Sequence, residues 1–338
     1  MKLNIYKRAS FIFALSVLSL SSCSNDEDFA PQHNALPEDG VIRISASVNQ
    51  LVASRAGAEV YTGDNLGLYI RPSDAGSWGY DATTNKYTYP NVKFTQTDKE
   101  WSQDRYNPML WKGSGVNYEY YAYAPYNVSA TDGKIPFDLS GQESNTDEKN
   151  DLLWASETGT ASSLLNGQKK LDIEFEHAFC MVAVEISLAD EFYQNGAIDN
   201  PITDISISSS SIKGNFDVFK GNVYVNSENT EDANNPAAGY LSFTISDSEH
   251  THGGRLTDGT YKSSEIFYAP GKENFEIIIT TKSGNRTYTY THGSEYTFER
   301  GNKYIIKLKM GKDVVQMGEI TATMWQWQDG GTGNLETE

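Results

Sequence analysis

The stretch Val41-Ile42-Arg43-Ile44-Ser45-Ala46-Ser47-Val48 decides the fold class, because apolar and mostly polar residues alternate along it. This period of two is typical of a β-strand with one buried face. Leu171-Asp172-Ile173-Glu174-Phe175 repeats the pattern, and about a dozen short strand-like runs recur between Gly, Asn, Asp and Ser clusters. The chain is therefore predicted to be all-β, in antiparallel sandwiches. The inward face of the first run would consist of Ile42, Ile44, Ala46 and Val48.

The length and charge of the chain limit its organisation and its partners. Its 338 residues are enough for two domains, and helix signals are nearly absent. We expect two tandem antiparallel β-sandwich domains, residues 41–180 and 181–338, with the boundary inside the apolar run from Phe175 to Leu188. A formal net charge of −18 gives an electrostatic field of the wrong sign for DNA or RNA. Nucleic acids are therefore excluded as partners.

The first 22 residues have the features of an export signal. A basic start precedes an apolar run, Phe11 to Leu20, which is too short to span a bilayer as a helix but fits a signal peptide. Leu20-Ser21-Ser22-Cys23 follows and resembles a bacterial lipobox, in which the cysteine is acylated and becomes the new N-terminus. An ordinary signal peptide with an incidental cysteine is the alternative. The expected lipidation site is Cys23, after a signal peptide of residues 1–22.

The residues after Cys23 indicate where the protein is sent. Ser24-Asn25-Asp26-Glu27-Asp28 is an acidic run that resembles the export tag of surface lipoproteins in Bacteroidota. The alternative is a solvated tether, because like charges keep a linker extended. We expect residues 23–40 to form a lipidated acidic linker, and the protein to lie on the cell surface with its lipid in the outer membrane.

The histidines give no convincing metal site. His250 and His252 could hold a metal with Asp247 and Glu249. A solvated polar loop is favoured, because structural zinc usually takes Cys or further His ligands. We expect no metal and no cofactor.

The candidate catalytic residues have simpler structural explanations. Cys180 lies in an apolar run and is expected to be a small buried residue, although His177 stands three positions before it. Asp172, Glu174 and Glu176 follow one another at every second position, and such carboxylates normally mark the water side of a strand. An enzyme is not expected.

A series of short segments carries a family resemblance. The segments are Arg55-Ala56, Tyr61 to Tyr69, Tyr121 to Tyr126, Asp151 to Ala155, Phe175 to Ile186, Gly214 to Asp217, Ala269 to Gly271 and Phe298 to Tyr304. In this order, behind a lipobox, they resemble the fimbrillin family, the lipoprotein-derived pilins of Bacteroidales fimbriae. The resemblance implies two transthyretin-like β-sandwich domains and a structural role as a fimbrial subunit or fimbrillin-like adhesin.

The resemblance also implies a route of assembly. In the family, a trypsin-like surface protease cuts the lipidated precursor after an arginine and removes the first strand, and a strand of a neighbouring subunit fills the groove. The matching positions here are Arg55 and Ala56 for the cut and Val41 to Val48 for the strand that leaves. Strand addition of this kind pairs the backbone groups of an open sheet edge. The alternative is that Arg55 is a surface residue and the chain stays uncut.

The C-terminal segment contains a strand that could fill such a groove. Ile320, Ala322 and Met324 share one face of a strand-like stretch that follows the run ending near Met310. The stretch is either the domain's own last strand or a strand offered to a neighbour, and the resemblance favours a polymerising subunit over a tip. The expected partners are other fimbrial subunits, the same or related, the trypsin-like protease, and a ligand on a host or bacterial surface.

The aromatic content supports one alternative function. Exposed Tyr and Trp often stack on sugar rings in surface glycan-binding lipoproteins, and the same lipid anchor would serve that role. The candidates for such a platform are Trp78, Trp101 and Trp111. Tyr and Trp are also good strand residues, which favours the structural interpretation.

Overall fold

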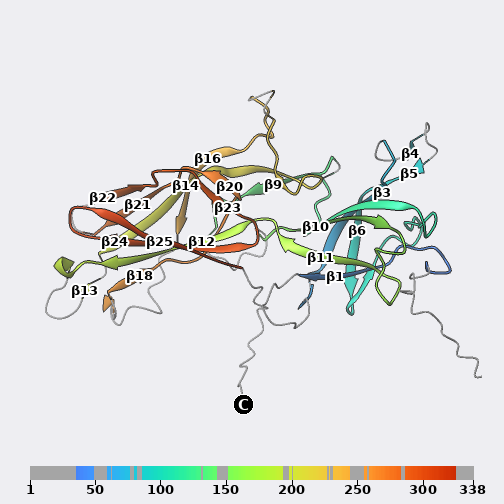
Figure 1. The fold of residues 1–338 in the computed structure, drawn as a ribbon, viewed down its shortest axis with the longest axis horizontal. Helices are drawn as coiled ribbons and strands as arrows, with labels where there is room; N and C mark the ends of the chain where they lie inside the picture. The colour runs from blue at the N-terminus through green and yellow to red at the C-terminus, as the bar shows by residue number, and fades with distance from the viewer. Residues whose placement is uncertain are drawn as a thin grey trace, which may run out of the picture. The chain divides into compact units, whose positions relative to one another are not determined.

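β-Strands make up nearly all of the regular structure in the computed structural model (Figure 1). The structure describes residues 36–48, 59–61, 63–76, 80–81, 86–130, 132–142, 151–192, 198–199, 201–226, 228, 231–243, 255–256, 259–282 and 286–324. These residues belong to one compact unit, Asn34–Glu338, and their one helical element is the 3-10 turn η1 (Asp190–Phe192). The predicted all-β class is confirmed. In the described ranges, no helix is long and apolar enough to cross a membrane.

The first sheet has eight strands and takes up the N-terminal part of the described chain. All neighbouring strands in it are antiparallel, except that β1 and β11 run parallel. In spatial order the strands are β2 (Glu59–Val60), β1 (Ile44–Val48), β11 (Leu171–His177), β10 (Leu153–Thr160), β8 (Asn117–Ala124), β3 (Asn65–Pro72), β6 (Tyr89–Thr97) and β7 (Glu100–Ser102).

The two faces of this sheet contribute to different apolar cores. Tyr118 and Tyr120 of β8 belong to a core cluster that we call the N-terminal core, whose buried members run from Ile42 to Phe175. Tyr123 of the same strand and Tyr69 of β3 belong instead to a larger cluster, the main core, which reaches Met310. Both faces are therefore covered over part of the sheet, which is why β3 is buried at almost every position.

Two further sheets enclose the main core and form two layers in Figure 1. One has β18 (Thr260–Lys262), β12 (Cys180–Leu188), β24 (Asn302–Met310) and β25 (Val315–Met324) in spatial order, with β19 (Ile266–Tyr268) also paired to β12. The other has β15 (Asn222–Val223), β14 (Ile202–Asp217), β21 (Glu276–Thr281) and β22 (Thr287–Thr291), with β16 (Ala237–Phe243) and β9 (Lys134–Asp138) also paired to β14. The remaining pairs are β20 (Gly271–Glu273) with β23 (Tyr296–Phe298), β4 (Tyr80–Asp81) with β5 (Lys86–Tyr87), and β13 (Ile198–Asp199) with β17 (Arg255–Leu256).

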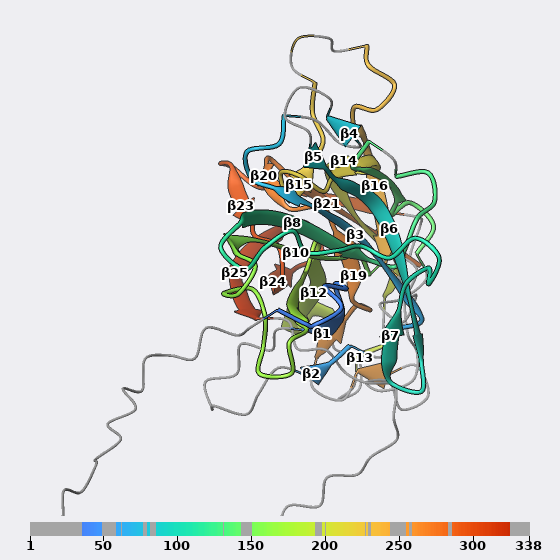
Figure 2. The same cartoon turned by 90° about the vertical axis from the view of Figure 1, so that its right-hand side faces the viewer.

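Alternating apolar residues hold the two layers together. Val184 of β12 and Ile306 of β24 lie in the same fully buried cluster as Ile207 of β14 and Ile277 of β21. Side chains from facing sheets that interdigitate in this way form the interior of a β-sandwich. Figure 2, turned by 90°, shows β14 and β21 on the other side of this core from β12 and β24.

Strand β9 joins the N-terminal part of the chain to the second layer. It lies between β8 and β10 in the sequence, yet it pairs antiparallel with β14, from Lys134 opposite Asp217 to Asp138 opposite Lys213. The predicted boundary near residue 180 remains a prediction. If the chain is divided at residue 180, β9 belongs by sequence to the N-terminal part but pairs with β14 of the C-terminal part.

The ion pair of Asp138 and Lys213, at the end of this ladder, is expected to make the stability of the fold slightly sensitive to acid. Hydrogen bonds from Lys213 and Ser140 hold the pKa of Asp138 at about 2, below its usual value near 4. Because the folded-state pKa is depressed, the pair stabilises the fold above pH ~4, and this contribution is lost as the pH falls from about 4 to about 2. Both side chains are half exposed, so we expect less than about 1 kcal/mol.

Urea unfolding at several pH values measures this contribution. Asp138→Asn should remove the pair's share of the pH dependence between pH 4 and 2 and cost under about 1 kcal/mol at pH 7. Asp98→Asn, in an exposed turn, is the matched control and should change neither. An Asp138→Asn variant that keeps the full pH dependence would contradict the assignment.

Trp154, the second residue of β10, connects the first sheet to the main core. Its Nε1 donates a hydrogen bond to the Val218 carbonyl at 2.7 Å, and the guanidinium of Arg300 lies 4.4 Å from its ring centroid. Arg300 is also 3.3 Å from Glu176 of β11 and donates to the Gly221 carbonyl at 2.9 Å. Gly221 has φ +64°, and a Cβ there would approach both Trp154 and Arg300 to 2.7 Å. Glycine is therefore required at this contact.

Candidate functional site

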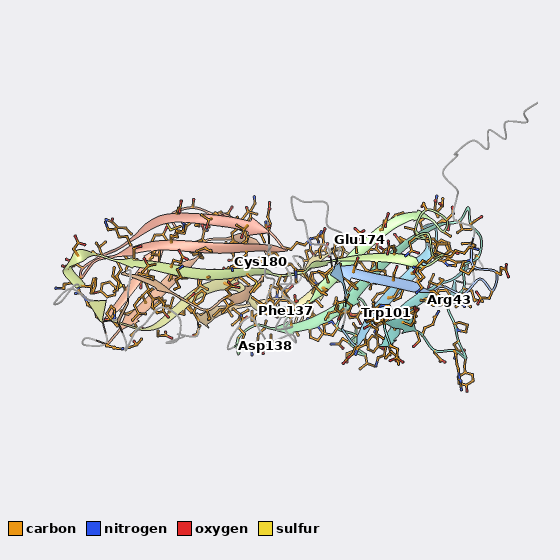
Figure 3. The ribbon with its side chains drawn as sticks, turned by 90° about the horizontal axis from the view of Figure 1, so that it is seen from below. Arg43, Trp101, Phe137, Asp138, Glu174 and Cys180 are labelled. Carbon is orange, nitrogen blue, oxygen red and sulfur yellow. The ribbon has the colours of Figure 1, made fainter. Side chains whose placement is uncertain are left out.

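The family resemblance implies that the strand of residues 41–48 leaves, and β1 of the structure lies within this segment, near the edge of the first sheet. It pairs in parallel with β11 along all five residues, from Ile44 opposite Leu171 to Val48 opposite Phe175. On its other side the two-residue strand β2 covers only its end. Figure 3 shows β1 beside β11, with Arg43 just before β1 and Glu174 on β11. Removing β1 would therefore expose the edge of β11 from Leu171 to Phe175.

The apolar side chains of this segment are part of the N-terminal core. Ile42, Ile44, Ala46 and Val48 are each at most 5% exposed and belong to the same cluster as Phe175. The structure thus brings these four predicted residues together on one buried face, in the alternation expected from the sequence. A subunit without them would have an apolar groove along β11.

The loop of residues 103–111 forms hydrogen bonds with the residues just before β1. The amide of Ile42 donates to the Met109 carbonyl at 2.9 Å, and the amide of Trp111 donates to the Gly40 carbonyl at 2.8 Å. The side chain of Gln103 donates to the Ile42 carbonyl at 2.7 Å. These contacts extend the pairing of the segment beyond β1 itself.

Three polar side chains fix the register between β1 and β11, and sequence analysis did not find them as a group. The Ser45 hydroxyl donates to Asp172 Oδ1 at 2.7 Å and accepts from Asn166 Nδ2 at 2.8 Å. Both bonds are part-buried, and Ser45 and Asp172 are directly opposite in the ladder. We call these three residues the hydroxyl clamp. Asn166 lies far from Ser45 in the sequence, so no local pattern points to it.

An exposed ion pair precedes the strand. Arg43 Nη2 lies 2.6 Å from Asp39 Oδ2, and both side chains are about half exposed. Hydrogen bonds from Arg43 and from the Val41 amide lower the pKa of Asp39 to about 2. At such exposure the pair adds little to the hold on β1, which therefore depends on apolar burial and backbone pairing.

The predicted donor residues lie in β25, at the edge of a different sheet. β25 pairs antiparallel with β24, Ile320 opposite Ile306 and Ala322 opposite Tyr304. Ile320 is half-buried and Ala322 is exposed. Met324 ends the strand, and its side chain lies outside the described set. In this structure the segment is thus the last strand of its own sheet.

Several predicted residues lie outside the described residues. These are the lipidation site Cys23, the cleavage residues Arg55 and Ala56, the histidine pair His250 and His252, and Trp78. Their roles remain predictions.

The candidate catalytic residues lie in structural surroundings. His177 Nδ1 is 2.8 Å from Asp151 Oδ1, and both side chains are buried. Cys180 is fully buried, its thiol donates to the Tyr268 carbonyl, and burial raises its pKa. Both features suit the interior of a fold rather than contact with a substrate.

The strand carboxylates line one hollow of the surface. Asp172, Glu174 and Glu176 line about 400 Å³ together with Glu157 of β10. Burial, and then the charges of Glu174 and Asp172, raise the pKa of Glu157. In the described ranges, no group of three or more His, Cys, Asp or Glu side chains could hold a metal ion.

Two of the three aromatic residues proposed for a glycan platform, Trp101 and Trp111, pack against other rings. Trp111 is buried, and its ring packs edge-on against Tyr118 at 4.9 Å. Trp101 of β7 is half-buried and stacks on Tyr61 at 5.9 Å. Trp111 is thus withdrawn from the surface, and Tyr61 stacks on the ring of Trp101, so these two tryptophans do not form a joint exposed platform for a sugar.

Comparison with known proteins identifies the family. The chain is similar to two solved structures described as putative cell adhesion proteins, one from Bacteroides ovatus ATCC 8483 (TM-score 0.54) and one from Bacteroides uniformis ATCC 8492 (TM-score 0.52). Each is 17% identical and covers 86% of this chain, over 99% and 100% of its own length, which shows a shared fold. A search among curated proteins gives no match. A family model described as fimbrillin-like matches residues 54–327, well over half of the sequence, and the chain therefore belongs to the fimbrillin-like family.

Proposed function

We propose that this protein is a structural subunit of a cell-surface fimbria. It is exported as a lipoprotein through Cys23, cut after Arg55, and assembled by exchange of the segment Val41 to Val48 for a strand of a neighbouring subunit. The family match supports the fimbrial role, because it covers most of the chain. Attachment of the precursor by lipid in the outer membrane follows from the lipobox-like sequence.

One observation supports this assembly route above the others. The segment proposed to leave carries four residues of the N-terminal core, but only β11 pairs with the whole length of β1. Its removal would leave an apolar groove and a row of unpaired backbone groups along β11, which is the kind of edge that accepts an added strand. With a net charge of −18, subunits repel one another, so association has to come from strand pairing and apolar burial.

Limited trypsin digestion of the full-length protein tests the route. We expect a cut after Arg55, which gives a chain that starts at Ala56, followed by slow growth of polymers. Intact mass and N-terminal sequencing identify the cut, and light scattering with negative-stain microscopy follows the polymers.

Two substitutions make this test specific. Arg55→Ala should abolish both the cut and the polymers, whereas Arg55→Lys should keep both with trypsin and lose both with an arginine-specific protease. A subunit that is cut after Arg55 and stays monomeric would contradict assembly by strand exchange.

A further inference from the structure

Side-chain contacts join the two ends of the first sheet, whose end strands are β2 and β7. Tyr61, the residue after β2, stacks on Trp101 of β7 with the ring planes 4° apart. Lys170 Nζ, just before β11, lies 2.9 Å from Glu100 Oε2 of β7. The segment Val41 to Val48 therefore lies between β11 on one side and, on the other, Tyr61 together with the loop that follows β7.

The start of this segment is bonded to the loop on the side that faces away from β11. Both backbone polar groups of Ile42 are bonded to the loop, the amide to the Met109 carbonyl and the carbonyl to the side chain of Gln103. The carbonyl of the next residue, Arg43, instead accepts from the Leu171 amide of β11 at 2.7 Å. Successive residues of a strand direct their backbone groups to opposite sides, so the segment is held from two sides at this point.

Gln103 is the side chain that connects the loop to the segment. Its Nε2 donates to the Ile42 carbonyl at 2.7 Å, and its Oε1 accepts from the Met109 amide at 2.8 Å. The two bonds require a donor and an acceptor on one planar group, which a glutamine amide supplies. A glutamate could still accept from Met109, but it would turn a negative oxygen toward the Ile42 carbonyl. It would therefore oppose only the contact with the segment.

The two ends of the loop are fixed on strands that stay when the segment leaves. The loop begins directly after β7, and beyond its other end the amide of Lys112 donates to the Tyr118 hydroxyl of β8 at 2.8 Å. Met109 and Trp111 of the loop are buried in the same N-terminal core as Ile42. The loop can therefore hold the segment without leaving with it.

We propose that the 103–111 loop retains the segment Val41 to Val48 in the uncut chain, and that Gln103 is the residue that positions the loop on Ile42. The contact determines how often the segment detaches, and so controls the step that opens the N-terminal core for assembly. The proposal deepens the proposed function and rests on it, because detachment has a role only if the segment leaves.

Hydrogen exchange of the uncut full-length protein, followed by mass spectrometry, tests this role. We expect Gln103→Glu to make the amides of residues 40–48, 109–111 and 171–175 exchange roughly tenfold faster, which corresponds to about 1.4 kcal/mol. Because the segment detaches as a unit, the three regions should change together, while β14 and β21 of the main core stay protected. Asn107→Asp places the same charge at the exposed tip of the loop and should leave exchange unchanged.

Three results would overturn the role of the loop and leave the fimbrial function standing. The first is equal exchange in Gln103→Glu and wild type, and the second is faster exchange confined to residues 109–111. The third is an increase by the same factor in β14 and β21, which would mean that Gln103 supports the whole fold. A wild-type chain that is never cut would overturn the proposed function and leave the exchange result as it is, since the exchange experiment needs no cut.

A disulfide between the loop and the segment gives a test that does not depend on Gln103. Val41 and Leu110 are opposite each other in an antiparallel bridge, between the two backbone hydrogen bonds that join the loop to the segment. Such a pair has its Cα atoms about 4.5 Å apart, within the range of a disulfide.

The variant Val41→Cys/Leu110→Cys is made together with Cys23→Ser, so that the buried Cys180 is its one further cysteine. In the oxidised form, residues 44–48 should exchange roughly tenfold more slowly than in the reduced form, because the disulfide keeps the segment on the loop. Equal exchange in the two forms, with the disulfide verified by peptide mass, would overturn the proposal.

Discussion

Trp154→Ala is expected to lower the free energy of unfolding by about 4 kcal/mol. The substitution removes a large buried ring from the main core and the partner of the Val218 carbonyl. It also deprives Arg300 of the ring on which it lies. Since Trp154 belongs to β10 of the first sheet, the loss should loosen the contact of that sheet with the main core as well as the core itself.

Urea unfolding followed by far-UV circular dichroism measures this loss. Trp154→Phe should retain most of the packing and cost about 1–2 kcal/mol, mainly for the unpaired carbonyl. Tyr106→Ala is the control for removal of an aromatic residue, because Tyr106 is 77% exposed, and it should cost under about 0.5 kcal/mol. A loss below about 1.5 kcal/mol for Trp154→Ala would contradict the role assigned to this ring.

Local patterns predict the strands well because each strand has to bury one face. The alternation of Val41 to Val48 and of Leu171 to Phe175 predicts both strands and their inward residues. Polar carboxylates on the outer face of β11 follow from the same period. The buried environment of Cys180 is likewise predictable from its apolar neighbours.

Pairing between distant segments could not be predicted in the same way. The sequence around β9 contains nothing that specifies β14 as its partner, because a strand's period of two fixes its faces and leaves its neighbours open. For the same reason, the sequence does not predict that β1 and β11 run parallel, or that Asn166 contributes to the hydroxyl clamp. The burial of Trp111 could not be predicted either, because an aromatic residue near a strand can be buried or exposed.

The proposed removal of β1 leads to a second large expected effect, for Ile44→Asp. Ile44 is 1% exposed in the N-terminal core, and an unpaired carboxylate there costs several kcal/mol. Because β1 lies next to the edge of its sheet, the chain can avoid this cost by detaching the segment. We therefore expect trypsin to cut the variant after Arg55 roughly a hundredfold faster than the wild type, as the opened state becomes more populated.

The variant also distinguishes effects on the uncut precursor from effects on the cut subunit. The chain that begins at Ala56 has the same sequence whether it comes from wild type or from Ile44→Asp, so polymers should grow at equal rates once both are cut. The uncut Arg55→Ala/Ile44→Asp variant should polymerise, whereas uncut Arg55→Ala should stay monomeric. Ser47→Asn, on the outer face of β1, is the matched control and should behave like wild type. Two results for the uncut double variant would together contradict this role of β1. They are an unfolding midpoint in urea equal to that of Arg55→Ala, which would mean that the charge at residue 44 costs no stability, and the absence of polymers.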